Sequence, residues 1–112
     1  MTTLLSQFLT EARDLLDEAS RGLVALEREP ESEEVTNRVF RAVHTLKGGA
    51  GFLAYESLTR LLHAAEDTLV ALRARKLAPT PELIDLQLDC LDLVGTWLDS
   101  LAEREALPAD AS

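Results

Sequence analysis

Aromatic residues, cysteine and basic charge are all scarce in this sequence of 112 residues. Aromatics make up only 4% of it and β-branched runs are few, whereas leucine and alanine are abundant, so helix is favoured over strand. The single cysteine, Cys90, excludes an internal disulfide and fits a reducing compartment. No apolar run approaches the ~20 residues of a membrane-spanning helix, and the N-terminus lacks the features of a signal peptide. These absences predict a cytoplasmic chain that does not enter a membrane.

Net charge also limits the partners. The chain carries 11 basic and 20 acidic residues, a formal charge of −9, which argues against a nucleic-acid partner. The charge is uneven, because residues 38–60 have a local balance of +3 and leave −12 for the rest. The cations of this segment are Arg38, Arg41, Lys47 and Arg60. These cations either belong to ordinary solvated helix faces or form a patch that attracts an anion.

Apolar residues recur with a helical period in four segments, 3–28, 33–47, 56–76 and 81–105. The inward stripe expected for the last segment consists of Leu83, Leu86, Cys90, Leu93, Trp97 and Leu101. Four amphipathic helices with short connections predict an all-α, up-and-down antiparallel four-helix bundle. The predicted domain is 1–106, with 107–112 as the start of a flexible linker.

The breaks between the segments carry ordinary capping signals. Pro30 disfavours helix at the residue before it, and Ser32 is a suitable N-cap for the second helix. Thr80 is the corresponding N-cap for the fourth, with Pro81 in its first turn, where proline is tolerated.

The most informative stretch begins at His44 and continues through Lys47 to a cluster of glycines at 48–51. Residues three and four apart share a helix face, so Lys47 lies beside His44 and Gly48 lies one turn below it. The glycines have two interpretations. They are either a helix C-cap and turn, or a way to leave the imidazole uncovered. An exposed imidazole beside a cation suits a histidine that receives a phosphoryl group and hands it on.

The third helix offers partners for this histidine. His63 and Glu66 are three residues apart, so both can face the second helix at the level of His44. Glu66 would accept a proton from one imidazole nitrogen, His63 would join the same network, and Lys47 would neutralise phosphate oxygens. Taken singly, each residue is also compatible with an ordinary surface or core-edge position. Cys90 and Trp97 are expected to be core residues.

A metal site and a nucleotide-binding site are the two alternatives to a phosphoacceptor histidine. His44, His63 and Glu66 offer ligand types that a metal ion accepts, but Lys47 would repel the metal, and paired Glu-x-x-His motifs are missing. We therefore expect no metal site. The sequence also contains no GxxxxGK[ST] loop and no dinucleotide fingerprint, so the phosphoryl group is expected to come from another domain or protein.

The run from Phe40 to Leu53 contains the pattern His-x-Leu-Lys-Gly, and with Leu62-His63-Ala64-Ala65-Glu66-Asp67 it resembles the histidine phosphotransfer domain family. Within that family it is most similar to the N-terminal domains of CheA-type chemotaxis histidine kinases. The resemblance implies that His44 is the phosphoacceptor, that Lys47, Glu66 and His63 support it, and that Gly48 keeps it accessible.

The resemblance also implies partners. The phosphoryl donor would be a kinase ATP-binding domain, which holds the ATP and Mg²⁺, and the acceptor an aspartate of a CheY-like response regulator. The regulator would dock on the first two helices near His44, and Arg41 and Gly51 are our candidate contact residues. The isolated domain is expected to be a monomer without autonomous catalysis and without a cofactor of its own. The alternatives are a hybrid-kinase or stand-alone phosphorelay protein, or a helical interaction module that is not phosphorylated.

Overall fold

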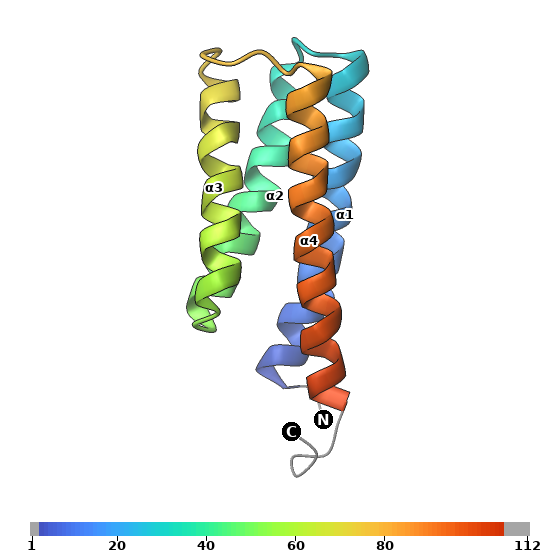
Figure 1. Ribbon diagram of the computed structural model, residues 1–112, viewed down its shortest axis with the longest axis vertical. Coiled ribbons are helices and arrows are strands. Elements are labelled where there is room, and N and C mark those ends of the chain that lie inside the picture. Colours follow the sequence, from blue (N-terminus) through green and yellow to red (C-terminus); the bar gives the residue numbers. More distant parts are fainter. Residues whose placement is uncertain (1–2, 107–112) are drawn as a thin grey trace.

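Four antiparallel helices form an elongated bundle with principal extents of 50 × 22 × 21 Å (Figure 1). The computed structural model describes residues 3–106, so the predicted linker at 107–112 lies outside the described residues. The helices are α1 (Leu4–Arg28), α2 (Glu33–Phe52), α3 (Glu56–Arg73) and α4 (Pro81–Ala106). Each helix packs on its neighbours in the ring, and α3 and α4 contact each other least. The predicted fold class is confirmed.

The helix starts follow the capping signals of the sequence. The Ser32 hydroxyl accepts a hydrogen bond from the Val35 amide at 3.2 Å, and the Thr80 hydroxyl accepts one from the Leu83 amide at 3.2 Å. Each side chain satisfies an amide that the helix itself leaves without a partner. Both predicted N-caps are confirmed.

The core is a continuous layer of aliphatic side chains from all four helices. On α2, Val39, Val43 and Leu46 are 0–1% exposed, as their spacing predicts. Burying a side chain of this size contributes about 1.5–3 kcal/mol, so α2 is held firmly along this face. His44 follows Val43 directly and is therefore carried to the edge of the buried face. No described helix is both long and apolar enough to cross a bilayer.

The inward face of α4 is shifted along the sequence by one position from the predicted stripe. The structure buries Ile84, Gln87, Leu91, Val94 and Leu98. Two residues of the predicted stripe, Leu86 and Leu93, are instead 62% and 43% exposed. Cys90 and Trp97, expected in the core, are only half-buried at its border. Apolar residues occupy two adjacent stripes of α4, so periodicity alone could not select the one that meets the core.

The end of α2 also differs from the prediction. The helix continues through the glycine cluster to Phe52, five residues beyond the predicted end at Lys47. The left-handed residue that terminates it is Ala54, with φ of 61°, and no described glycine has a positive φ. The Tyr55 amide donates to the Ala50 carbonyl at 2.9 Å and the Ala54 amide to the Gly51 carbonyl at 3.1 Å, as in a Schellman motif. The C-cap interpretation of the glycines is therefore wrong.

Two neighbouring glycines of α2 serve different needs, and alanine substitutions should separate them. A Cβ at Gly48 would meet no atom within 4 Å, whereas one at Gly49 would lie 2.9 Å from Cε1 of Phe8 on α1. We expect Gly48→Ala to raise the free energy of unfolding by about 0.5–1 kcal/mol through helix propensity. Gly49→Ala should lower it by about 1–3 kcal/mol through overpacking. Chemical denaturation measures both, and equal effects would contradict this distinction.

Candidate functional site

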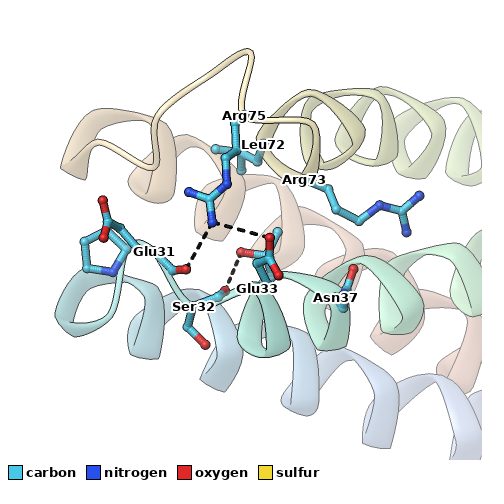
Figure 2. Close-up of a pocket in the computed structure, with 9 residues that line it drawn as sticks. Glu31, Ser32, Glu33, Asn37, Leu72, Arg73 and Arg75 are labelled. Atoms are coloured by element: carbon cyan, nitrogen blue, oxygen red, sulfur yellow. Dashed lines mark hydrogen bonds and ion pairs between the residues drawn. The ribbon is translucent and has the colours of Figure 1, made fainter.

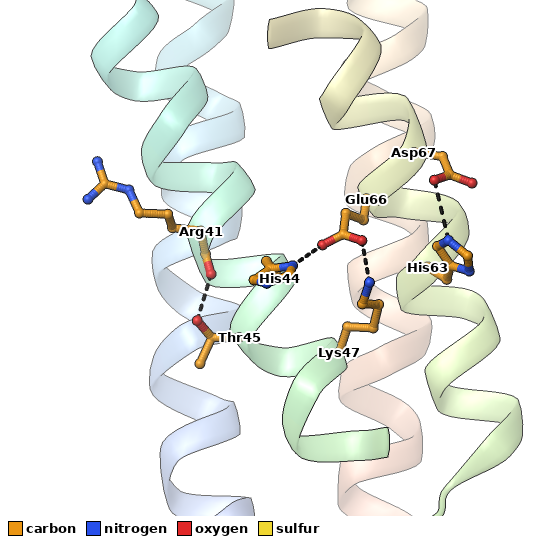
Figure 3. A network of polar contacts seen from close by, with 7 residues as sticks. All are labelled: Arg41, His44, Thr45, Lys47, His63, Glu66 and Asp67. Atoms are coloured by element: carbon orange, nitrogen blue, oxygen red, sulfur yellow. Dashed lines mark hydrogen bonds and ion pairs between the residues drawn. The ribbon is translucent and has the colours of Figure 1, made fainter. Parts of the chain in front are cut away.

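His44 lies near the middle of α2 on the side that faces α3 (Figure 3). Its side chain is 60% exposed, although the preceding residue, Val43, is fully buried. The helix therefore anchors the backbone of His44 while leaving most of the imidazole open to solvent. His44 therefore lies at the edge of the buried face of α2.

Glu66 of α3 reaches toward α2 and contacts this imidazole. One of its carboxylate oxygens, Oε2, hydrogen-bonds Nδ1 of His44, and its side chain is only 9% exposed. An ionised carboxylate can only accept hydrogen bonds, so Nδ1 carries the proton that it donates. In a neutral ring, the second nitrogen, Nε2, is then left with a free lone pair. This tautomer is the nucleophilic form of a neutral histidine.

Lys47 completes the network from the next turn of α2. Its Nζ donates to the other Glu66 oxygen, Oε1, at 2.5 Å, and its side chain is 25% exposed. Burial raises the pKa of the Glu66 carboxyl, but hydrogen bonds from Lys47 and His44, together with their charges, outweigh it and leave the pKa below the ordinary value. Glu66 is therefore a carboxylate at neutral pH, with a different donor on each oxygen.

The lowered pKa of Glu66 predicts acid sensitivity of the fold. A carboxyl whose pKa is lower in the folded state contributes stability above its unfolded pKa of about 4.3, and this contribution is lost as the pH falls through the folded pKa. We expect the free energy of unfolding of the wild type to drop more steeply below about pH 4.3 than that of Glu66→Gln. Glu11→Gln, at an exposed position of α1, is the matched control. Parallel pH profiles for wild type and Glu66→Gln would contradict the prediction.

An aromatic ring that the sequence analysis did not select lies against His44. Phe40, one turn earlier on α2, stacks on the imidazole with ring centroids 5.7 Å apart and planes inclined by 12°. On α3, the Cζ of Arg73 lies 4.0 Å from the centroid of the Phe40 ring. The i, i+4 spacing of Phe40 and His44 was a signal for this contact, but nothing in the sequence pointed to Arg73.

His63 does not contact this network in the structure, so the expected contact is not formed and its supporting role stays a prediction. Its side chain is 60% exposed, and its Nε2 lies 3.5 Å from Oδ1 of Asp67, one turn further along α3 (Figure 3). The i, i+4 neighbour on its own helix is within reach, whereas Glu66 is turned toward α2. His44, Glu66 and His63 therefore do not converge as metal ligands. Within residues 3–103, where side chains are described, no three His, Cys, Asp or Glu side chains are arranged to hold a metal ion.

The predicted accessibility and partner residues lie around this network without touching it. Arg41 is exposed and its guanidinium points away from His44, while its carbonyl accepts a hydrogen bond from Thr45 at 2.8 Å (Figure 3). Gly48 and Gly51 both have open space where a side chain would begin. The surface beside His44 toward the C-terminal end of α2 is therefore uncovered.

The polar hollow shown in Figure 2 lies elsewhere, where the α1–α2 connection meets the end of α3. It has a volume of about 180 Å³, and Arg75 spans it with 3.5 Å contacts to the Glu31 carbonyl and the Glu33 carboxylate. Because these polar groups already satisfy one another, we assign the hollow no role. The candidate site among the described residues is therefore His44 with Glu66 and Lys47.

The Hpt domain family matches residues 3–104 of this chain. The Sensor histidine kinase CheAY of Helicobacter pylori is 36% identical over 100 residues, which cover 89% of this chain and 12% of that protein. The chain thus spans a small part of this much longer relative.

Solved structures show the same architecture. The CheA phosphotransferase domain from Thermotoga maritima superposes with a TM-score of 0.84 at 33% identity, covering 88% of this chain and 93% of that one. The phosphorylated P1 domain of CheA3, solved in complex with CheY6 from R. sphaeroides, has a TM-score of 0.84 at 24% identity, with coverage of 93% and 82%. At 24% identity, the likeness to the CheA3 domain shows that the two chains share a fold and nothing more.

Proposed function

This chain belongs to the Hpt domain family and is of the CheA type, and from that premise we propose that it carries a phosphoryl group on Nε2 of His44. The group would come from ATP held by a kinase ATP-binding domain and pass to an aspartate of a response regulator. The observation that carries the proposal is the Nδ1 hydrogen bond to Glu66, because it leaves Nε2 free on an exposed ring. A cytoplasmic setting is part of the proposal, since ATP is the donor.

The transfer consists of two displacements at phosphorus. In the first, the Nε2 lone pair forms a bond to the γ-phosphorus while the bond to the bridging oxygen breaks and ADP leaves with the electron pair. In the second, a carboxylate oxygen of the regulator attacks the same phosphorus and the lone pair returns to Nε2. Nδ1 keeps its proton throughout, and the Glu66 carboxylate stabilises the positive charge that the phosphorylated ring carries.

Lys47 would contribute charge to both displacements. Its ammonium lies one turn from His44 and is held in place by Glu66 at 2.5 Å. An ammonium group has three donors, so Lys47 can keep its bond to Glu66 and still direct another donor at a phosphoryl oxygen. Electrostatic stabilisation of this kind is strongest when the cation is oriented before the reaction begins.

The response regulator is the partner class that the geometry supports best. The P1 domain of CheA3, which shares this fold, was solved together with CheY6, so a receiver-type protein can dock on a bundle of this shape. Arg41 and Gly51 are accessible on the same helix as His44. We propose that they lie within the docking face, and that the domain is a monomer when isolated.

A two-stage labelling experiment tests the proposal. The domain is incubated with the ATP-binding domain of a CheA-type kinase and ATP labelled at the γ-phosphate, and a response regulator is then added. We expect acid-labile label on the domain, followed by its movement to the regulator. Absence of label with several active kinase domains would overturn the proposal and favour an interaction module that is not phosphorylated.

Gly48→Gln should slow phosphorylation of His44 without harming the fold. Helical side chains lean toward the N-terminus, so a glutamine at this position would lie over the turn that contains His44. We expect the phosphorylation rate to fall about tenfold, because small displacements of reacting groups are costly. Gly48→Ala, whose methyl group meets open space, is the matched control and should retain most of the rate. Equal rates for the two variants would show that the glycine does not serve access.

A further inference from the structure

We propose that Phe40 is a positioning residue for His44 and that Arg73 holds the Phe40 ring in place from α3. The inference rests on the proposed function, since it concerns how the imidazole is presented to phosphorus. It adds an aromatic residue of α2 and a cationic residue of α3 to the network of Glu66 and Lys47.

The first observation is the geometry of the stack. The rings of Phe40 and His44 are nearly parallel, at 12°, with centroids 5.7 Å apart, an offset arrangement that aromatic pairs favour. Phe40 is half-buried, and its ring packs against the core. This packing restrains the position of the ring. A restrained ring beside the imidazole limits rotation of His44 about its side-chain bonds.

The second observation is what surrounds the imidazole. Glu66 fixes one edge of the ring through Nδ1, and Phe40 stacks on it from the preceding turn. One turn in the other direction stands Gly48, with no atom within 4 Å of where its Cβ would be. His44 is thus supported from the N-terminal side of α2 and open on the C-terminal side. Phosphoryl donors and acceptors would therefore approach over Gly48 and not over Phe40.

The third observation concerns Arg73. Among residues 3–103, whose side chains the structure describes, this arginine forms no ion pair with a carboxylate, and its guanidinium instead lies 4.0 Å from the centroid of Phe40. A cation over an aromatic face is attracted by the ring's electron-rich surface, and this attraction favours one position of the half-buried ring. Because Arg73 belongs to the last turn of α3, the contact also joins the two helices that carry the network.

Ring spectroscopy combined with a small phosphodonor tests the inference. Nitrogen NMR measures the fraction of the Nδ1–H tautomer of His44, and phosphoramidate measures its phosphorylation rate without a docking partner. We expect Phe40→Leu to lower the tautomer fraction and to reduce the rate about tenfold, and Phe40→Tyr to restore both. Arg73→Ala should give a smaller change in the same direction. Arg75→Ala, which removes a guanidinium two residues away that does not touch Phe40, should give none.

The outcomes separate the inference from the proposed function. Unchanged tautomer and rate in Phe40→Leu, with a wild type that is phosphorylated, would overturn the positioning role and leave the proposed function standing. A wild type that is never phosphorylated would overturn the proposed function, while the tautomer measurement would still decide whether Phe40 orients the ring. A tautomer fraction and a phosphorylation rate that fall equally in Phe40→Leu and Phe40→Tyr would also contradict the inference. The aromatic ring, which Phe40→Tyr keeps, would then not be what positions His44. Circular dichroism confirms that each variant is folded.

Discussion

His44→Gln is expected to abolish phosphorylation completely while leaving the bundle folded. The side chain is 60% exposed, and its contacts with Glu66 and Phe40 lie at the border of the core, so the helix content should not change. The glutamine amide nitrogen has no free lone pair comparable to that of an imidazole and cannot form the phosphorus–nitrogen bond. The measurement is incorporation of labelled phosphate, with circular dichroism on the same sample.

The second histidine supplies the matched control for this prediction. His63 is equally exposed at 60%, but it pairs with Asp67 and not with Glu66. His63→Gln should therefore keep the label that His44→Gln loses. Label that persists in His44→Gln and disappears in His63→Gln would place the phosphoacceptor on α3 and contradict the account.

Replacing Glu66 is expected to have the second largest effect. Glu66→Ala removes the acceptor of the Nδ1 proton, so the imidazole loses both its tautomer preference and its orientation, and Lys47 loses the carboxylate that holds it. We expect phosphorylation to slow by about 10- to 100-fold without being abolished, because Nε2 is still present. Initial rates with phosphoramidate measure the effect independently of partner docking.

Glu66→Gln distinguishes orientation from charge. Its amide oxygen can still accept the Nδ1–H bond, but it carries no charge to stabilise the phosphorylated ring. A rate between those of the wild type and Glu66→Ala would show that both contributions operate. If Glu66→Ala is phosphorylated at the wild-type rate, the residue has no part in the chemistry, and the network is purely structural.

The sequence was sufficient for the parts of the molecule that depend on local patterns. Helical periodicity located four helices, and the side chains of Ser32 and Thr80 located two of their starts. The pairing of His44 with Glu66, 22 residues apart, was also accessible, because both lie on helices expected to face each other. A short connection between two antiparallel helices leaves few registers, and that constraint brings the two residues to one level.

Other features depended on packing that a pattern does not contain. α2 continues through its glycines because Gly49 fits against Phe8 of α1 and because Ala54 takes the left-handed position that ends the helix. The cost of helical glycine is offset by these tertiary contacts, which propensity does not include. His63 has two possible partners on geometric grounds, and only the structure shows that it meets Asp67. The contact of Arg73 with Phe40 likewise joins two helices through side chains whose orientation no spacing reveals.

The central claim is that Nε2 of His44 is the atom that carries the phosphoryl group. The most direct test is nitrogen and phosphorus NMR of the labelled domain after treatment with phosphoramidate, which identifies both the residue and the ring nitrogen bonded to phosphorus. The account predicts phosphorus on Nε2 of His44, with the proton retained on Nδ1 next to Glu66. Phosphorus on Nδ1 of His44, or on His63, would contradict it.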